Sequence, residues 1–206
     1  MAKSEIPRKT IYRLSIYQRC LLRLKDNAVE TVSSEALAKA AGVKPPQLRK
    51  DLTYFGQFGT RGLGYNVGAL SGAIGEVLGS SRLQPVILVG VGNLGSALLR
   101  YGGFQKEGFE IIAAFDTHPS PARVKGIKTA LLNALELSTY IKEHQIKMAI
   151  LTVPAPNAQE VVNEMVAAGI QAVLNFSPVV LQVPKHVIVN NVDLAVELEN
   201  LSYFIR

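Results

Sequence analysis

The second half of the chain alternates between short apolar runs and stretches whose apolar residues fall at helical spacing. Val86–Val89 is a continuous apolar run, and Asn93–Phe104 behind it has the spacing of a helix. The strands expected after it are Glu110–Phe115, Met148–Val153, Ala172–Leu174 and Val187–Val189, and the helices are Leu135–His144 and Ala158–Ala168. Continuous apolar strands that alternate with helices predict an α/β fold, a doubly wound parallel sheet with helices on both faces.

The first half of the chain shows helical spacing and then a glycine-rich stretch. Its expected elements are an amphipathic helix Pro7–Lys25, short helices Glu35–Ala41 and Pro45–Tyr54, a glycine-rich hairpin at 56–65 and a connecting helix within 66–84. A Gly-Ser-Ser break follows the connecting helix at 79–81. We therefore expect a domain boundary near residue 82.

The two short helices match a helix–turn–helix. Ser33 and Ser34 offer an N-cap to the first helix, and Gly42 suits the tight turn behind it. In such motifs the N-terminal part of the second helix contacts base edges in the major groove of DNA. The candidates for these contacts are Gln47, Arg49 and Lys50, with Arg and Lys suited to guanine and Gln to adenine. Helix–turn–helix pairs also occur in proteins that bind no DNA, so the motif alone leaves that alternative open.

Further candidate DNA contacts surround this motif. Arg61, next to Thr60 near the hairpin tip, has the position of a wing residue, and a narrow minor groove attracts such a cation. Tyr54 and Arg13 are candidates for contacts to phosphates. Together these features predict a winged helix-turn-helix DNA-binding domain over residues 1–82.

The charge distribution favours a polyanionic partner for the first half. The chain has 206 residues and a net charge of +6. Residues 1–80 contain twelve Lys and Arg against six Asp and Glu, whereas residues 81–206 contain ten of each kind. The whole excess therefore precedes residue 81, as expected of a nucleic-acid-binding segment. The alternative is an ordinary solvated basic surface.

A glycine motif opens the first helix of the second half. It is Gly90-Val91-Gly92-Asn93-Leu94-Gly95, directly behind the apolar run Val86–Val89. The first glycine allows the tight turn, the second lets a pyrophosphate approach the backbone, and the third permits close packing of helix on strand. The helix N-terminus adds free N–H groups and a positive dipole end for phosphates. The alternative is an ordinary βα turn, which the strand–turn–helix context makes the weaker interpretation.

Polar residues at the ends of later strands complete the candidate site. Asp116, followed by Thr117, ends the next strand, where a carboxylate binds the adenosine ribose hydroxyls and repels a 2′-phosphate, so NAD(H) is favoured over NADP(H). Ligands of doubly wound sheets lie outside the carboxyl ends of the strands. Thr152-Val153-Pro154 and Asn175-Phe176 follow apolar strands and are candidates for the nicotinamide end. Either segment is equally compatible with an ordinary loop.

Features of an enzyme, a metalloprotein or a membrane protein are not apparent. None of the three histidines, His118, His144 and His186, is placed as the acid or base of a hydride transfer. The single Cys20 excludes an internal disulfide and a cysteine-based metal cluster. No apolar run approaches the ~20 residues that span a bilayer, and residues 1–9 lack the apolar stretch of a signal peptide. We expect a soluble cytoplasmic protein that is neither an enzyme nor a metal binder.

These observations predict a DNA-binding protein that responds to a dinucleotide. Two alternatives stay open on the residues alone. One is a small NAD-dependent oxidoreductase with an accessory domain, and the other is a nucleotide-sensing adaptor that acts through protein contacts.

The order of these pieces resembles the Rex family of redox-sensing transcriptional repressors, bacterial winged-helix proteins that bind NADH. The resemblance runs from about Tyr12 to the C-terminus. Its most specific stretches are Gln47–Gly56, Gly59–Tyr65, Val89–Gly95, Leu151–Pro154 and Asn175–Pro178. Together they are far more specific than either the glycine motif or the helix–turn–helix alone.

The resemblance implies a homodimer on a pseudo-palindromic operator, released when NADH binds. It implies a nucleotide-binding domain at 83–191 and a dimerisation segment at 192–206, whose helix, Asp193–Phe204, is swapped between subunits. It also implies that Tyr101 lies near the nicotinamide and that Arg19 pairs with Asp193 of the partner subunit in one of two states. The alternatives are a helix that caps its own sheet, a core aromatic at Tyr101 and a solvated Arg19.

Overall fold

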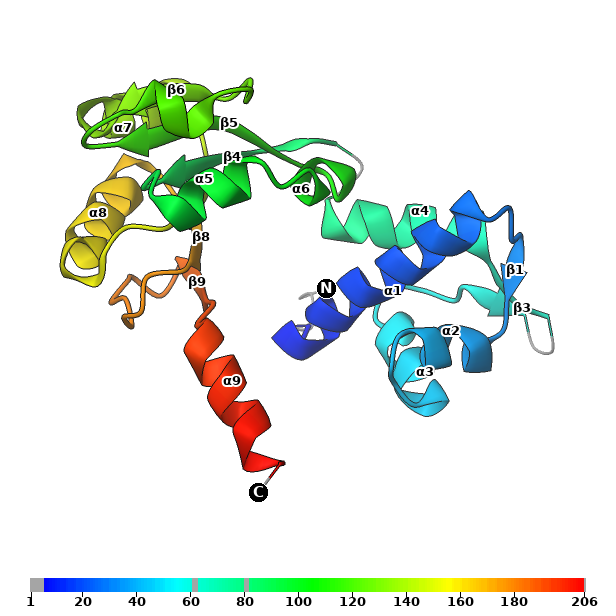
Figure 1. The fold of residues 1–206 in the computed structure, drawn as a ribbon. Coiled ribbons are helices and arrows are strands. Elements are labelled where there is room, and N and C mark those ends of the chain that lie inside the picture. The colour runs from blue at the N-terminus through cyan, green and yellow to red at the C-terminus, as the bar shows by residue number, and fades with distance from the viewer. Residues whose placement is uncertain (1–5, 61–62, 80–81, 206) are drawn as a thin grey trace. The chain divides into compact units, whose positions relative to one another are not determined.

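The computed structural model describes residues 6–60, 63–79 and 82–205 (Figure 1). The chain divides into two compact units, Met1–Arg82 and Leu83–Arg206. Each unit has its own hydrophobic core, so each is described by itself.

The N-terminal unit combines four helices with a small antiparallel sheet, as far as its residues are described. Its elements are α1 (Arg8–Asp26), β1 (Thr31–Val32), α2 (Ser34–Ala40), α3 (Pro45–Thr53), β2 (Gly59–Thr60), β3 (Gly64–Asn66) and α4 (Val67–Leu78). The strand order is β1-β3-β2. Ser33 caps α2 by accepting a hydrogen bond from the backbone N–H of Ala36, and Gly42 takes the left-handed conformation (φ 68°) in the turn before α3. The expected winged helix-turn-helix is therefore present.

Helix α4 is part of this core rather than a simple connector, which corrects the sequence-based expectation. It lies beside α1 (Figure 1), and its buried Leu70 and Ile74 belong to the same apolar cluster as Leu14, Tyr17 and Leu21 of α1. The apolar positions of α4 recur at helical spacing, and such a stripe is stable only when another element covers it. In this unit α1 provides that cover.

The C-terminal unit is built around a parallel sheet. Its elements are β4 (Gln84–Val89), α5 (Asn93–Leu99), α6 (Gly103–Lys106), β5 (Phe109–Asp116), a 3-10 turn η1 (Pro121–Val124), β6 (Ala130–Asn133), η2 (Ala134–Glu136), α7 (Leu137–Glu143), β7 (Met148–Leu151), α8 (Ala155–Ala168), β8 (Ala172–Asn175), β9 (Ile188–Asn191) and α9 (Leu194–Tyr203). The described strands form one six-stranded parallel sheet in the order β6-β5-β4-β7-β8-β9. This is the doubly wound order of a dinucleotide-binding fold, and it confirms the expected fold class.

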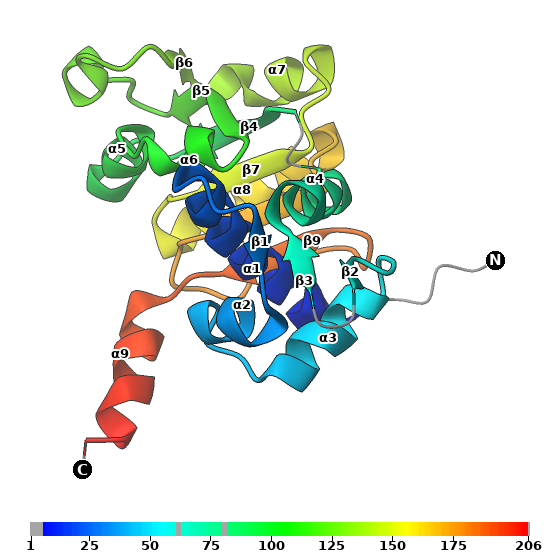
Figure 2. The ribbon, with the colours of Figure 1, turned by 90° about the vertical axis from the view of Figure 1, so that its right-hand side faces the viewer.

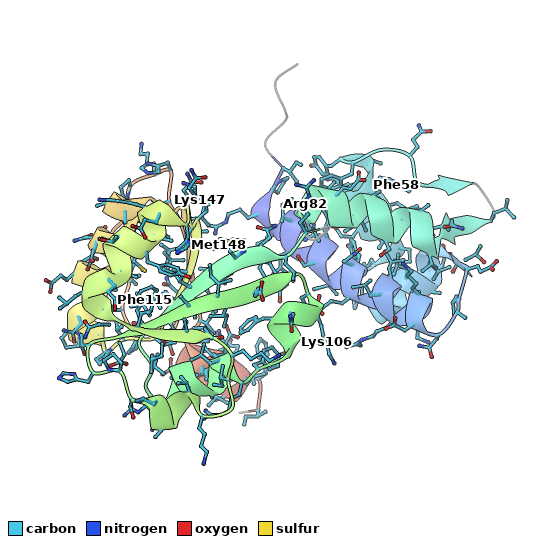
Figure 3. The ribbon with its side chains drawn as sticks, turned by 90° about the horizontal axis from the view of Figure 1, so that it is seen from above. Phe58, Arg82, Lys106, Phe115, Lys147 and Met148 are labelled. Carbon is cyan, nitrogen blue, oxygen red and sulfur yellow. The ribbon has the colours of Figure 1, made fainter. Side chains whose placement is uncertain are left out.

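Apolar side chains cover both faces of this sheet. On one face Phe115 packs with Leu137 of α7 and Met165 of α8. On the other face Met148, Leu98 of α5 and Phe104 of α6 pack against a buried cluster that includes Leu88 and Ile150. Figure 3 labels Phe115 and Met148 within the sheet. Burial on both faces explains why the central strands are continuous apolar runs.

Two elements differ from the sequence-based expectation. The helix expected over 93–104 is two helices, α5 and α6, because the chain turns at Tyr101-Gly102. Strand β6 was not expected, because its four residues sit at the sheet edge and their apolar pattern runs on into that of α7.

Helix α9 buries none of its residues and projects from β9 away from the sheet (Figures 1 and 2). Asp193 caps it by accepting hydrogen bonds from the backbone N–H groups of Ala195 and Val196. Leu198 and Leu201 are 67% and 64% exposed. The apolar residues exposed over this segment are Leu194, Val196, Leu198, Leu201, Tyr203, Phe204 and Ile205. No helix among the described residues is both long and apolar enough to cross a membrane.

Candidate functional site

The turn from β4 into α5 is shaped by two glycines. Gly90 has a φ of 97°, and its carbonyl oxygen accepts a hydrogen bond from Thr152 Oγ1 at 2.6 Å. A Cβ on Gly95 would collide with that same carbonyl oxygen. A Cβ on Gly92 would meet nothing within 4 Å, so this glycine faces open space. The turn therefore has the tight glycines at its base and the open one where a ligand could approach.

Asp116 holds the glycine turn from the end of β5. Its Oδ2 accepts a hydrogen bond from the backbone N–H of Val91 at 2.7 Å, and its Oδ1 accepts one from the N–H of His118 at 2.9 Å. An ionised carboxylate has about four acceptor sites, so each oxygen keeps capacity for one more donor. Asp116 can therefore brace the turn and still accept hydrogen bonds from two ligand hydroxyls.

A cavity of about 970 Å³ opens at the carboxyl ends of the central strands β4, β5 and β7. Its lining includes Gly90, Gly92, Asp116, Thr117, Arg123, Asn133, Leu135, Thr152, Val153, Pro154, Asn157, Glu160 and Glu164. The volume is at the upper end of what small-molecule sites need. The cavity brings together the glycine turn, Asp116 and the loop after β7. These three segments are far apart in the sequence.

Two features of the cavity were missed by sequence reasoning. Arg123 of η1 donates a hydrogen bond from Nη1 to the carbonyl oxygen of Val91 at 2.7 Å, which sets a cation beside the glycine turn. Leu135, 90% exposed, stands at the rim. The turn that holds Leu135 could have been predicted from the sequence, because Asn133 and Glu136 form a capping box there. Nothing in the pattern around Arg123 indicates its position.

Three predicted cofactor residues away from the glycine turn, Asn175, Phe176 and Tyr101, do not line this cavity. Within the turn, the residues outside the lining are Val91, Asn93, Leu94 and Gly95. Asn175 holds its own loop, since its Nδ2 donates to the carbonyl oxygens of Ser177 and Val179 and to Asn191 Oδ1. Phe176 packs against the core on the α5 face. Tyr101 is 60% exposed and makes an edge-to-face contact with Phe104. Contacts of these three residues with a cofactor stay predictions.

The outward face of α3 carries two of the three predicted base contacts, Arg49 and Lys50. Lys50 and Arg49 are exposed, while Leu48 and Leu52 on the opposite face are buried. Arg49 Nη1 donates to Ser34 Oγ at 3.0 Å and lies 3.4 Å from Glu35 Oε1. Tyr54, the C-cap residue, is 39% exposed. Of the wing residues, Thr60 lies in β2 and Arg61 lies outside the described residues.

Two predicted DNA contacts converge instead on a buried carboxylate. Asp51 of α3 is 1% exposed. Arg13 of α1 donates two hydrogen bonds to this carboxylate, from Nε at 2.6 Å and from Nη2 at 2.7 Å. Tyr17 Oη and Gln47 Nε2 donate to it at 2.7 and 2.9 Å, and Thr10 Oγ1 at 3.3 Å. Arg13 therefore keeps mainly its Nη1 for a phosphate, and that contact stays a prediction.

This cluster keeps Asp51 ionised. Burial alone raises the pKa of the carboxyl group, but the hydrogen bonds from Arg13, Tyr17 and Gln47 outweigh burial and leave the pKa below its ordinary value. Burial and the bond to Asp51 both raise the pKa of Tyr17. At neutral pH the cluster thus consists of a carboxylate surrounded by donors, which links α1 to α3.

Comparison with known proteins gives relatives along nearly the whole chain. The family model described as "Putative DNA-binding protein N-terminus" matches residues 5–53, and the one described as "CoA binding domain" matches residues 81–179. The chain is 47% identical over 204 residues to the "Redox-sensing transcriptional repressor Rex" of Syntrophobacter fumaroxidans, covering 98% of this chain and 97% of the relative. It is 43% identical over 198 residues to the Streptomyces coelicolor protein of the same name, covering 96% and 77%.

Solved structures agree with these relatives. The chain matches a crystal structure of RSP in complex with β-NAD⁺ and operator DNA with a TM-score of 0.88 and 36% identity, covering 98% of this chain and 93% of that one. It matches RSP in complex with β-NADH with a TM-score of 0.85 and 35% identity, covering 98% and 95%. RSP itself is described as a Rex-family repressor.

Proposed function

The chain belongs to the Rex family of redox-sensing transcriptional repressors, and from this premise we propose that it represses transcription by binding operator DNA and senses the NADH/NAD⁺ ratio. The observation that carries the proposal is the match over 98% of the chain to a repressor solved both with NAD⁺ on operator DNA and with NADH. The family consists of repressors, so the protein is not an enzyme and the oxidoreductase alternative is not favoured. A role on DNA agrees with a cytoplasmic location, which we infer.

We propose that NAD(H) occupies the cavity and that its lining residues contact successive parts of the cofactor. In our proposal Gly92 leaves room for the pyrophosphate, and the N-terminus of α5 supplies N–H groups to it. Asp116 accepts hydrogen bonds from the hydroxyls of the adenosine ribose, and Arg123 offsets the phosphate charge. Thr152, Val153 and Pro154, which also line the cavity, contact the nicotinamide end of the cofactor.

We also propose that the protein is a homodimer on a pseudo-palindromic operator. The support is the exposed apolar helix α9, because contiguous apolar surface of this kind marks an interaction site. A second copy of the chain is its partner, so that residues 192–206 exchange between subunits. Light scattering that finds a monomer at micromolar concentration contradicts this part of the proposal.

Ligand chemistry explains how NADH could act as a signal. A ligand shifts an equilibrium only by its differential affinity for the two states. The nicotinamide ring of NAD⁺ is charged and that of NADH is neutral, and burial of an unpaired charge is costly. In our proposal NADH stabilises a closed dimer whose two α3 helices no longer match the half-site spacing. NAD⁺, or an empty site, leaves the DNA-competent state.

Titration of operator binding with each nucleotide tests this function. We expect NADH to weaken operator affinity about 100-fold, which requires only ~2.7 kcal/mol of coupling, and NAD⁺ to have little effect. The measurement is fluorescence anisotropy of labelled operator DNA. The same titration is carried out on an Arg19→Ala variant. Pairing of Arg19 with Asp193 of the partner subunit would couple the two units, so we expect NADH to release this variant less effectively. Equal responses to NADH and NAD⁺ contradict redox sensing, and normal release by the variant removes that pair from the mechanism.

Replacement of Asp116 tests the ribose contact. Asp116→Ala removes the acceptor for two ligand hydroxyls and also the brace on the Val91 N–H. Hydrogen bonds to a charged group contribute ~1.5–3 kcal/mol each, so we expect NADH affinity to fall at least tenfold. Calorimetric titration of NADH measures this loss, and Glu110→Ala, an exposed acid of β5 outside the cavity lining, is the matched control. NADH affinity equal to that of the wild type would exclude the ribose contact.

A further inference from the structure

The buried carboxylate of Asp51 controls the side chain of Gln47, which is one of the predicted base contacts. Gln47 lies in the first turn of α3, one helical turn before Asp51. Its Nε2 donates to Asp51 Oδ1 at 2.9 Å. An ionised carboxylate only accepts hydrogen bonds, so the amide nitrogen of Gln47, and not its oxygen, must face Asp51. The orientation of the amide is thus set by chemistry.

The cluster makes that orientation hard to reverse. Arg13 and Tyr17 hold the same carboxylate from α1, which prevents Asp51 from turning to follow Gln47. Reversal of the amide would bring its oxygen against a carboxylate oxygen and would remove a donor from a buried charge. Both changes are costly in a partly buried site.

The DNA bases differ in what they offer to such a side chain. In the major groove adenine and cytosine present an exocyclic amino group, whereas guanine and thymine present a carbonyl oxygen at the corresponding edge. A glutamine that rotates freely can serve either pair, because its amide carries both a donor and an acceptor. A glutamine with its nitrogen held inward presents its oxygen first.

We propose that Asp51 is a positioning residue for specificity: it holds Gln47 with its amide oxygen toward the DNA, so that Gln47 selects adenine or cytosine and rejects guanine and thymine. The proposal rests on the proposed operator-binding function and adds a base preference to it. The earlier assignment of Gln47 to adenine becomes one half of this selection.

Selection of binding sites from a randomised double-stranded DNA pool tests the proposal, with the full-length protein and no added NADH. The base pair that Gln47 reads is identified with Gln47→Met, which keeps the shape of the side chain and removes the amide. At that position the wild type is expected to favour adenine and cytosine over guanine and thymine by roughly tenfold, the size of one hydrogen bond with its desolvation cost. Gln47→Met is expected to lose this preference and to retain those at the other positions.

The Asp51→Asn variant separates positioning from mere support of the fold. An asparagine at 51 has both a donor and an acceptor, so it no longer dictates which end of the Gln47 amide faces the DNA. We expect discrimination against guanine and thymine to fall at that one position, whereas a general loss of folding would lower affinity for every sequence alike. Circular dichroism checks that the variant is folded. If it is not, the wild-type base preference at the position located with Gln47→Met decides, because a freely rotating amide would serve both pairs of bases.

The outcomes distinguish this inference from the proposed function. A wild-type preference for guanine or thymine at the Gln47 position overturns the inference and leaves the repressor function intact. So does a selected site in which Gln47→Met changes no position. Failure of the wild type to enrich any DNA sequence overturns the proposed function itself.

Discussion

A Lys50→Ala variant is expected to lose operator affinity by roughly 30- to 20,000-fold while it binds NADH as well as the wild type. Lys50 is exposed on α3, on the face opposite the buried Leu48 and Leu52. A specific contact between a side chain and a base contributes ~1–3 kcal/mol, and a homodimer loses one in each half-site. Anisotropy with operator DNA and fluorescence titration of NADH measure the two affinities.

The matched control removes the same charge from the other unit. Lys147 is exposed just before β7, far along the chain from the helix–turn–helix (Figure 3). Lys147→Ala is expected to leave operator affinity within about twofold, because an exposed charge outside the DNA-binding unit acts only through screened electrostatics. Unchanged operator affinity in Lys50→Ala would show that α3 does not read DNA through this residue.

Two glycine substitutions in the β4–α5 turn are expected to have very different effects. A methyl group at Gly95 collides with the carbonyl oxygen of Gly90, so the turn must open. Overpacking of this kind costs ~1–3 kcal/mol, and the displaced turn no longer fits a pyrophosphate. We expect Gly95→Ala to melt at a lower temperature and to lose NADH affinity by at least 100-fold, a factor that corresponds to ~2.7 kcal/mol. The variant should repress constitutively, because it cannot sense NADH.

Gly92→Ala is expected to lower NADH affinity without changing the stability of the fold. Its Cβ would meet nothing within 4 Å, and the backbone at this position (φ −77°) suits alanine. Thermal melting is therefore expected to match the wild type, while NADH affinity falls about tenfold because the methyl group takes the space that the pyrophosphate approaches. Calorimetric titration and a melting curve for both variants test the pair. Equal melting temperatures for Gly95→Ala and the wild type would contradict the close packing of this turn.

The glycine turn and the helix–turn–helix could be predicted from the sequence because their constraints are local. Gly90 must adopt a positive φ, Gly42 must turn the chain, and Ser33 must cap α2, and each requirement selects a residue type at a fixed offset. Asp116 was predictable for a similar reason, since it ends an apolar strand. The break between α5 and α6 was missed because helical spacing continues across Tyr101 and Gly102.

Contacts between distant segments could not be predicted in the same way. Arg123 reaches the Val91 carbonyl oxygen from a 3-10 turn that has no repeating pattern. The sequence predicts Asn175 as a cofactor residue, a contact that stays a prediction, and it does not indicate that the Asn175 amide holds its own loop and Asn191. A polar side chain after a strand looks the same in the sequence whether its partner is a ligand or the backbone.

The sequence by itself determined the fold class, the glycine turn, the place of Asp116 at a strand end and the basic first half. The spacing of apolar residues, the residue types of turns and the net charge of a segment are all properties of neighbouring residues. Only the tertiary structure decided which residues share a site. It joined Arg13 and Tyr17 of α1 to Asp51 and Gln47 of α3, and it placed α4 in the core beside α1. The physical reason is that a buried charge must find its donors wherever packing brings them. The sequence alone therefore does not show which distant donors meet such a charge.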